Sequence, residues 1–77
     1  MTLTNAQIKV MQEDMYASIV QLLMEHWGYA MEEAIGVLYN SDTFLRLQDK
    51  NTGFYYQSPG YVYSFLEHEM TNGTFGE

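Results

Sequence analysis

Apolar residues recur at intervals of three and four along the first third of the chain, which places them on one face of a helix. The residues on this stripe are Ile8, Met11, Met15, Ile19, Leu22 and His26. Thr4 with Gln7 forms a capping-box pattern, and Gly28 suits the left-handed conformation that commonly ends a helix. The pattern predicts a long helix from about Asn5 to Trp27, whose second half has a wider apolar stripe and forms the centre of the fold.

A second helix is predicted from about Met31 to Tyr39. Glu32 and Glu33 fall in its first turn, where the positive end of the helix dipole favours carboxylates. Gly36 is small enough to let another helix approach closely, although glycine weakens a helix. The expected inward face consists of Ala30, Ala34, Ile35 and Leu38.

Shorter segments are expected between this helix and the last one. Ser41 or Asp42 caps a short helix over Thr43 to Gln48. The polar residues 49–53 form a turn, and the aromatic residues 54–56 follow as an extended or irregular segment. This single aromatic run has no second strand to pair with, so no sheet is expected.

The last helix begins at Ser58-Pro59, because serine followed by proline at the first helical position is a strong start signal. It ends at Asn72-Gly73. The chain is therefore predicted to be all-α: a small bundle of three to four helices, with a long N-terminal helix and a tyrosine-rich loop before the last helix. We expect a single helical domain over residues 1–77, with residues 1–4 and 74–77 frayed.

Composition limits the classes of partner. The formal net charge is −7, from 10 acidic residues against Lys9, Arg46 and Lys50. Nucleic acids and anionic membranes attract clustered lysine and arginine, so neither direct nucleic-acid binding nor membrane binding is expected. The chain has no cysteine, which excludes disulfides and thiolate metal sites. A basic leader region and a membrane-spanning apolar stretch are also absent from the sequence, and we expect a cytoplasmic protein.

No catalytic, metal or cofactor site is predicted. His26 and His68 are the only histidines, and their glutamate neighbours point elsewhere because adjacent residues on a helix diverge. The acidic residues at 13–14, 32–33 and 67 with 69 fall at helix starts or on polar faces. General acid–base catalysis needs carboxylates whose pKa values are driven apart in a cleft, so we expect no enzyme activity.

Aromatic residues crowd the segment 54–63, and tyrosine is enriched at protein interfaces. Tyr61 and Phe65 lie one helical turn apart and are expected to face inward, whereas Tyr63 lies on the other side. Tyr55 and Tyr63 are therefore candidates for a partner-binding surface. Core packing and partner binding both remain open for the segment as a whole.

The first half of the long helix offers a second candidate surface. Its apolar stripe from Ile8 to Met15 exceeds what the shorter helices can cover, and exposed apolar surface of this kind marks an interface. We expect Met11 and Met15 to contact another protein, since methionine adapts to varied surfaces. The simplest partner is a second copy, which gives a homodimer at micromolar concentration, and the alternative is a different protein.

One part of the sequence resembles a group of very small bacterial proteins of unknown function that are common in gut-dwelling species. The residues that carry the resemblance are the run Met31–Phe44, continued by Leu47, Thr52-Gly53, Tyr55–Pro59, Tyr61–Tyr63, Leu66 and Glu69. The resemblance extends from about Met15 to Met70. Some of these proteins are encoded beside toxin-like genes, so the resemblance implies an antitoxin-like or accessory partner of a genomic neighbour. The group offers no established activity and no catalytic residues.

Taken together, these patterns predict a protein–protein interaction module. Two alternatives remain open: a small enzyme subunit with a site under the tyrosine-rich loop, and an acidic DNA mimic. An enzyme would cluster polar residues in a pocket, whereas a mimic would space its carboxylates like phosphates along one face.

Overall fold

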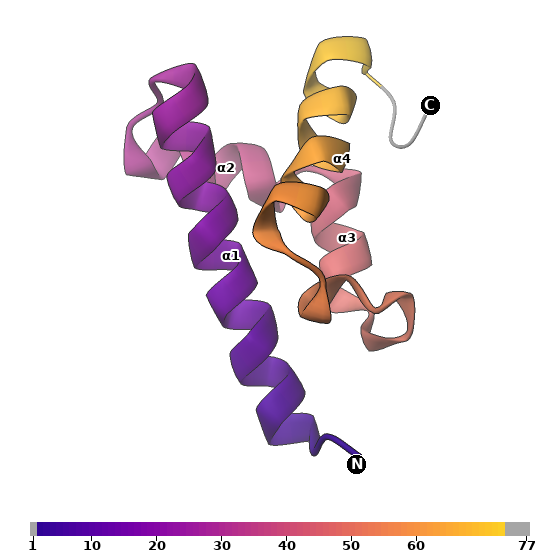
Figure 1. Cartoon of the computed structure of the whole chain (residues 1–77). Helices are drawn as coiled ribbons and strands as arrows, with labels where there is room; N and C mark the ends of the chain where they lie inside the picture. Colours follow the sequence, from indigo (N-terminus) through magenta and orange to yellow (C-terminus); the bar gives the residue numbers. More distant parts are fainter. Residues whose placement is uncertain (1, 74–77) are drawn as a thin grey trace.

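The computed structural model describes residues 2–73. Its α-helices are α1 (Asn5–Trp27), α2 (Met31–Tyr39), α3 (Asp42–Gln48) and α4 (Pro59–Asn72), and the 3₁₀ turns η1 (Lys50–Thr52) and η2 (Phe54–Tyr56) lie between α3 and α4. Figure 1 shows α1 running the length of the molecule, with the other helices beside it. The prediction of a small all-α bundle with a long N-terminal helix is confirmed, and no strand occurs within the described residues. Of the ends expected to be frayed, residues 1 and 74–77 lie outside the described residues.

Side-chain caps explain why the predicted helix limits lie so close to the observed ones. The N–H of Gln7 donates to Oγ1 of Thr4 at 3.1 Å, and the N–H of Thr4 donates to Oε1 of Gln7 at 2.8 Å. Ser41 caps α3, which therefore begins at Asp42, one residue before the predicted start. Ser58 caps α4 in the same way. Each cap satisfies a backbone N–H that a helix terminus leaves without an intrahelical partner.

The core forms where the second half of α1 meets the other helices. The buried apolar residues are Met15, Ile19, Leu23, Ala34, Leu38, Leu47, Val62, Tyr63 and Leu66. All four α-helices of the described chain contribute to this set, so burial of apolar surface holds each of them in place. The prediction that the second half of α1 is central is confirmed, because Ile19 and Leu23 are fully buried.

The inward face of α4 differs from the predicted one. Tyr63, expected on the outer side, is buried, whereas Tyr61, expected inside, is exposed, and Phe65 is only partly buried. The rings of Tyr61 and Phe65 instead pack against Phe54 of η2, with centroids 6.4 and 5.3 Å from it. η2 therefore covers the flank of α4 that helical spacing alone predicts to be core.

The inward face of α2 is also narrower than predicted. Ala34 and Leu38 are buried as expected, but Ala30 is an exposed N-cap residue and Ile35 is only partly buried. Gly36 does not admit a close helix, because a Cβ built there meets nothing within 4 Å. α2 thus keeps part of its apolar surface outside the core.

The longer helices hold α3 at both of its ends. At its C-terminal end, Nε2 of Gln12 on α1 donates to the carbonyl oxygens of Leu47 at 2.8 Å and Gln48 at 3.0 Å. At its N-terminal end, the carboxylate of Glu69 on α4 accepts hydrogen bonds from the first residues of α3. A helix of 7 residues is too short to persist alone, so these contacts fix its position.

Candidate partner-binding surface

The structure divides the residues predicted to bind a partner into two groups. Met15 is 4% exposed and Tyr63 is 6% exposed, so neither offers contact surface to a partner, and that part of the prediction is corrected. Met15 is the first core residue of α1, and Tyr63 of α4 packs against the C-terminal end of α1. Met11 and Tyr55 remain partly exposed. They come together beside Met15 in a small depression of about 220 Å³ between α1 and the segment before α4.

Tyr63 is buried against Trp27 and His26, the last two residues of α1. Its hydroxyl oxygen accepts a hydrogen bond from Nε1 of Trp27 at 3.0 Å, and its ring stacks on His26 with centroids 5.3 Å apart. Burial raises the pKa of Tyr63, the hydrogen bond from Trp27 opposes that rise, and the charge of Glu67 adds to it. A phenol needs a hydrogen-bond partner to enter a core, and Trp27 supplies one.

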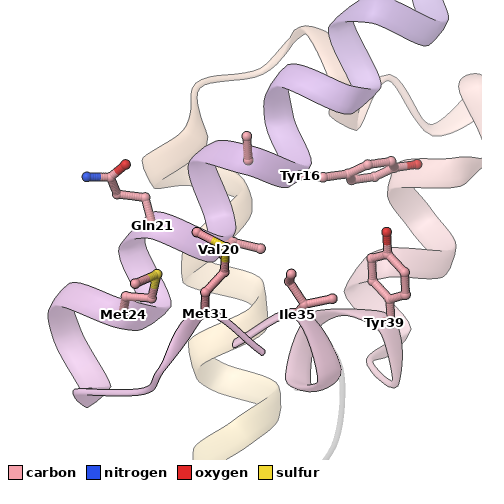
Figure 2. Close-up of a pocket in the computed structure, with 8 residues that line it drawn as sticks. Tyr16, Val20, Gln21, Met24, Met31, Ile35 and Tyr39 are labelled. Atoms are coloured by element: carbon pink, nitrogen blue, oxygen red, sulfur yellow. The ribbon is translucent and has the colours of Figure 1, made fainter. Parts of the chain in front are cut away.

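A larger apolar groove lies between α1 and α2, with a volume of about 380 Å³ (Figure 2). α1 lines it with Tyr16, Ala17, Val20, Gln21 and Met24, and α2 lines it with Met31, Ile35 and Tyr39. We refer to it as the α1–α2 groove. Sequence reasoning missed this site. Two features of the sequence could have indicated it: the wider apolar stripe of α1, and the spacing of three to four between the groove residues on each helix. Both features are equally typical of core packing.

The α1–α2 groove has a different chemistry at each end (Figure 2). Met24 and Met31 lie at the end near the loop that joins the two helices, and Tyr16 and Tyr39 lie at the other end. Phe44 of α3 packs against both tyrosines, since its ring centroid is 5.0 Å from that of Tyr16 and 4.6 Å from that of Tyr39. Met31 and Tyr39 remain 58% and 57% exposed, so a large apolar area at both ends faces water.

Acidic residues border the α1–α2 groove. Glu25 accepts a hydrogen bond from Nε2 of Gln21 at 3.1 Å, which places its carboxylate at the edge. Glu13 lies near Tyr16: burial is the main cause of that tyrosine's raised pKa, and the charges of Tyr39 and Glu13 raise it further. None of the described basic residues lines the groove. The site therefore combines an apolar interior with a negative border.

The histidines and Glu69, which the sequence analysis considered as metal ligands or catalytic groups, contact other residues of the fold. Within residues 2–73, no group of three or more His, Asp or Glu side chains comes together that could hold a metal ion. His26 stacks on Tyr63, and Nδ1 of His68 lies 3.2 Å from Nδ2 of Asn72. Glu69 is occupied by its contacts with α3. No helix in the described part of the chain has the length and apolar character needed to cross a bilayer.

Comparisons of the chain with protein-family models, with curated proteins and with solved structures found no match. The resemblance to small proteins of gut bacteria is not tested by these comparisons and stays a prediction. The case for a function therefore depends on the geometry of the surface described above.

Proposed function

We propose that this chain is a protein–protein interaction module that binds a partner protein through the α1–α2 groove. The observation that supports this proposal is an apolar groove of about 380 Å³ bordered by the exposed side chains of Met31 and Tyr39. Exposed contiguous apolar surface with a polar border is typical of binding sites on small proteins. In this proposal the chain acts by binding rather than by catalysis.

The side chains of the α1–α2 groove suit a binding role. Methionine is flexible and polarisable and adapts to the shape of a partner, while tyrosine combines a large apolar ring with a hydrogen-bonding hydroxyl. The backbone beneath them is firm, because the neighbouring residues Ile19, Leu23 and Leu38 are fully buried. A helical backbone that is already fixed keeps the ordering cost of binding low, because only side chains have to be immobilised.

The resemblance to proteins encoded beside toxin-like genes suggests where the partner is encoded. We propose a cytoplasmic antitoxin-like or accessory role in which the product of a neighbouring gene occupies the α1–α2 groove. The net charge of −7 favours a protein partner over nucleic acid.

A capture experiment from the native host tests this proposal. The bait is the tagged wild-type chain, and the groove variant is Ala17→Gln with Met31→Gln, which adds bulk and polarity at exposed positions without changing the charge. The matched control is Leu45→Gln, because Leu45 is 61% exposed, lies on α3 and does not line the groove. We expect a neighbouring gene product to bind the wild type and the control but not the groove variant. A partner retained by all three proteins would contradict this site.

A second apolar surface supports self-association as a second candidate role. Near the start of α1 a depression of about 430 Å³ is lined by Leu3, Ala6, Gln7, Val10 and Met11. Val10 is exposed there, and the first turns of α1 extend past α2 and α4 (Figure 1). We refer to these residues as the N-terminal strip. With Met15 buried, a homodimer contact on this helix falls on the N-terminal strip.

A further inference from the structure

We propose that the occupant of the α1–α2 groove is a basic amphipathic α-helix of the partner protein, with apolar residues facing the groove and lysine or arginine on its flanks. This inference rests on the proposed function and adds the chemistry of the bound segment. It follows from the length of the groove, from the kind of structure that lines it, and from the charge of its border.

The length of the groove fits a short stretch of helix. Each wall extends over eight residue steps, from Tyr16 to Met24 on α1 and from Met31 to Tyr39 on α2, which is about 12 Å at 1.5 Å per residue. A helix places side chains separated by about seven residues at nearly this spacing. One apolar side chain would then lie at the methionine end, one at the tyrosine end and one between them, beside Val20 and Ile35.

The walls favour a helix over an extended segment. Both are helices, whose backbone N–H and C=O groups are already hydrogen-bonded, and the described residues form no strand that could accept another strand at its edge. Side-chain packing into an apolar groove is the recognition mode left to such a surface, and helices are recognised in this way through residues at i, i+4 and i+7.

The charge of the border selects a basic occupant. Glu25 is hydrogen-bonded to the groove residue Gln21, and Glu13 lies three residues before the groove residue Tyr16 on α1, which places the two side chains next to each other on the helix surface. None of the chain's basic residues lies among the residues that line the groove, within the part that the structure describes. Lysine or arginine flanking the apolar face of a partner helix would meet these carboxylates, while an acidic helix would be repelled.

The same charges argue against a second copy of this chain as the occupant. Each copy carries a net charge of −7, so a second copy approaching the negative border of the groove would meet overall charge repulsion. Its basic residues are dispersed as well: Lys9 is on α1, Arg46 on α3 and Lys50 in η1. No helix within residues 2–73 therefore presents the paired basic flanks that the border favours.

Synthetic peptides of about four helical turns provide the test. All share leucines at i, i+4 and i+7, and their remaining positions are lysine, glutamine or glutamate. A fourth peptide scrambles the lysine sequence and so has no apolar face. Fluorescence anisotropy measures their binding to the wild-type chain, with circular dichroism to confirm that every variant remains folded.

We expect the lysine peptide to bind roughly tenfold more tightly than the glutamate peptide, with an affinity that falls as salt is added. Ala17→Gln with Met31→Gln should weaken the lysine and glutamine peptides alike. Glu13→Gln with Glu25→Gln should weaken the lysine peptide by about threefold or more and leave the glutamine peptide unchanged. The matched control, Asp14→Asn with Glu67→Gln, removes the same charge at exposed positions outside the groove and should leave the affinity within about twofold of wild type.

Each contrary result has a distinct meaning. If the lysine, glutamine and glutamate peptides bind the groove equally, the basic occupant is wrong, while a protein-binding groove stands. The inference also fails if the scrambled peptide binds as tightly as the amphipathic one, or if none of the peptides binds. A dimer of the wild type that Ala17→Gln with Met31→Gln abolishes would identify a second copy as the occupant instead. The proposed function itself is decided separately, by whether the host partner depends on the groove.

Discussion

Glu69 on α4 holds the first turn of α3 through Thr43: its Oε1 accepts hydrogen bonds from the backbone N–H of Thr43 at 3.1 Å and from the Thr43 hydroxyl at 2.9 Å. The other carboxylate oxygen accepts the N–H of Asp42 at 2.7 Å. A carboxylate at a helix N-terminus satisfies backbone donors and opposes the helix dipole. Thr43 is fully buried, so its hydroxyl depends on this partner.

Replacing Glu69 should destabilise the fold. Glu69→Ala removes the acceptor of three hydrogen bonds, two of them from backbone N–H groups, and should lower the free energy of unfolding by about 1–3 kcal/mol. Urea denaturation followed by circular dichroism measures the change. Asp14 on α1, which is exposed and makes no contact with α3 or Tyr63, supplies the control, and Asp14→Ala should change stability by less than about 0.5 kcal/mol. Equal effects of the two variants would show that the contact with Thr43 does not stabilise the protein.

Gly36→Ala should stabilise the protein. A Cβ at this helical position meets nothing within 4 Å, so alanine gains helix propensity without a clash, by about 0.5–1 kcal/mol. Gly53→Ala is the contrasting variant, because Gly53 has φ of 73° and its added Cβ would lie 2.6 Å from the hydroxyl oxygen of Tyr56. Thermal unfolding should show a higher Tm for Gly36→Ala and a lower Tm for Gly53→Ala. A lower Tm for both would mean that α2 packs more tightly around Gly36 than the structure indicates.

These residues show which parts of the fold a sequence can predict. Helix limits follow from local signals, since the side chains of Thr4 and Ser58 cap backbone groups within one turn of themselves. The burial of Tyr63 depends on Trp27, which is 36 residues away in the chain, and helical spacing carries no information about that partner. The sequence likewise gives no sign that Glu69 differs from a surface carboxylate, because its partners Asp42 and Thr43 are 27 and 26 residues away.

The α1–α2 groove could be predicted only in part. The apolar residues that line it, including Val20 and Met24, are visible in the sequence as a widened stripe. Their exposure could not be predicted, because it depends on how much of α1 the other helices cover. α2 has only 9 residues and turns Ala34 and Leu38 to the core, which leaves the groove open beside it.

Stability should fall at high pH through the ionisation of Tyr63, which is buried, and of Tyr16, which is partly buried. Burial raises the pKa of Tyr63, and it also raises the pKa of Tyr16. Tyrosine in an unfolded chain titrates near pH 10. The unfolded state then releases protons more readily than the folded one, so the stabilising contribution is full below about pH 10 and is lost as pH rises through the folded pKa. Urea midpoints measured from pH 7 to 11 should decline above about pH 10, and the decline should be smaller in Tyr63→Phe. An identical decline in that variant would rule out Tyr63 as a cause.

Self-association should depend on the N-terminal strip and not on the α1–α2 groove. Val10 is exposed and Met11 partly exposed on this strip, and the basic residue Lys50 lies beside it, with its Nζ 3.3 Å from Oδ1 of Asn5. Burying a shared apolar strip across a two-fold axis is the simplest way to remove it from water. We therefore expect sedimentation equilibrium at micromolar concentration to show a dimer for the wild-type chain.

Two variants, measured by sedimentation equilibrium, distinguish the N-terminal strip from the α1–α2 groove as the dimer contact. Val10→Glu places two carboxylates in the dimer contact and should give a monomer, and it should not alter circular dichroism because the side chain is exposed. Ala17→Gln with Met31→Gln changes only the α1–α2 groove and should leave the dimer intact. A monomeric wild type rejects the homodimer. A dimer that survives Val10→Glu rejects the N-terminal strip as its interface, because a shared contact at this position cannot tolerate two uncompensated charges buried against each other.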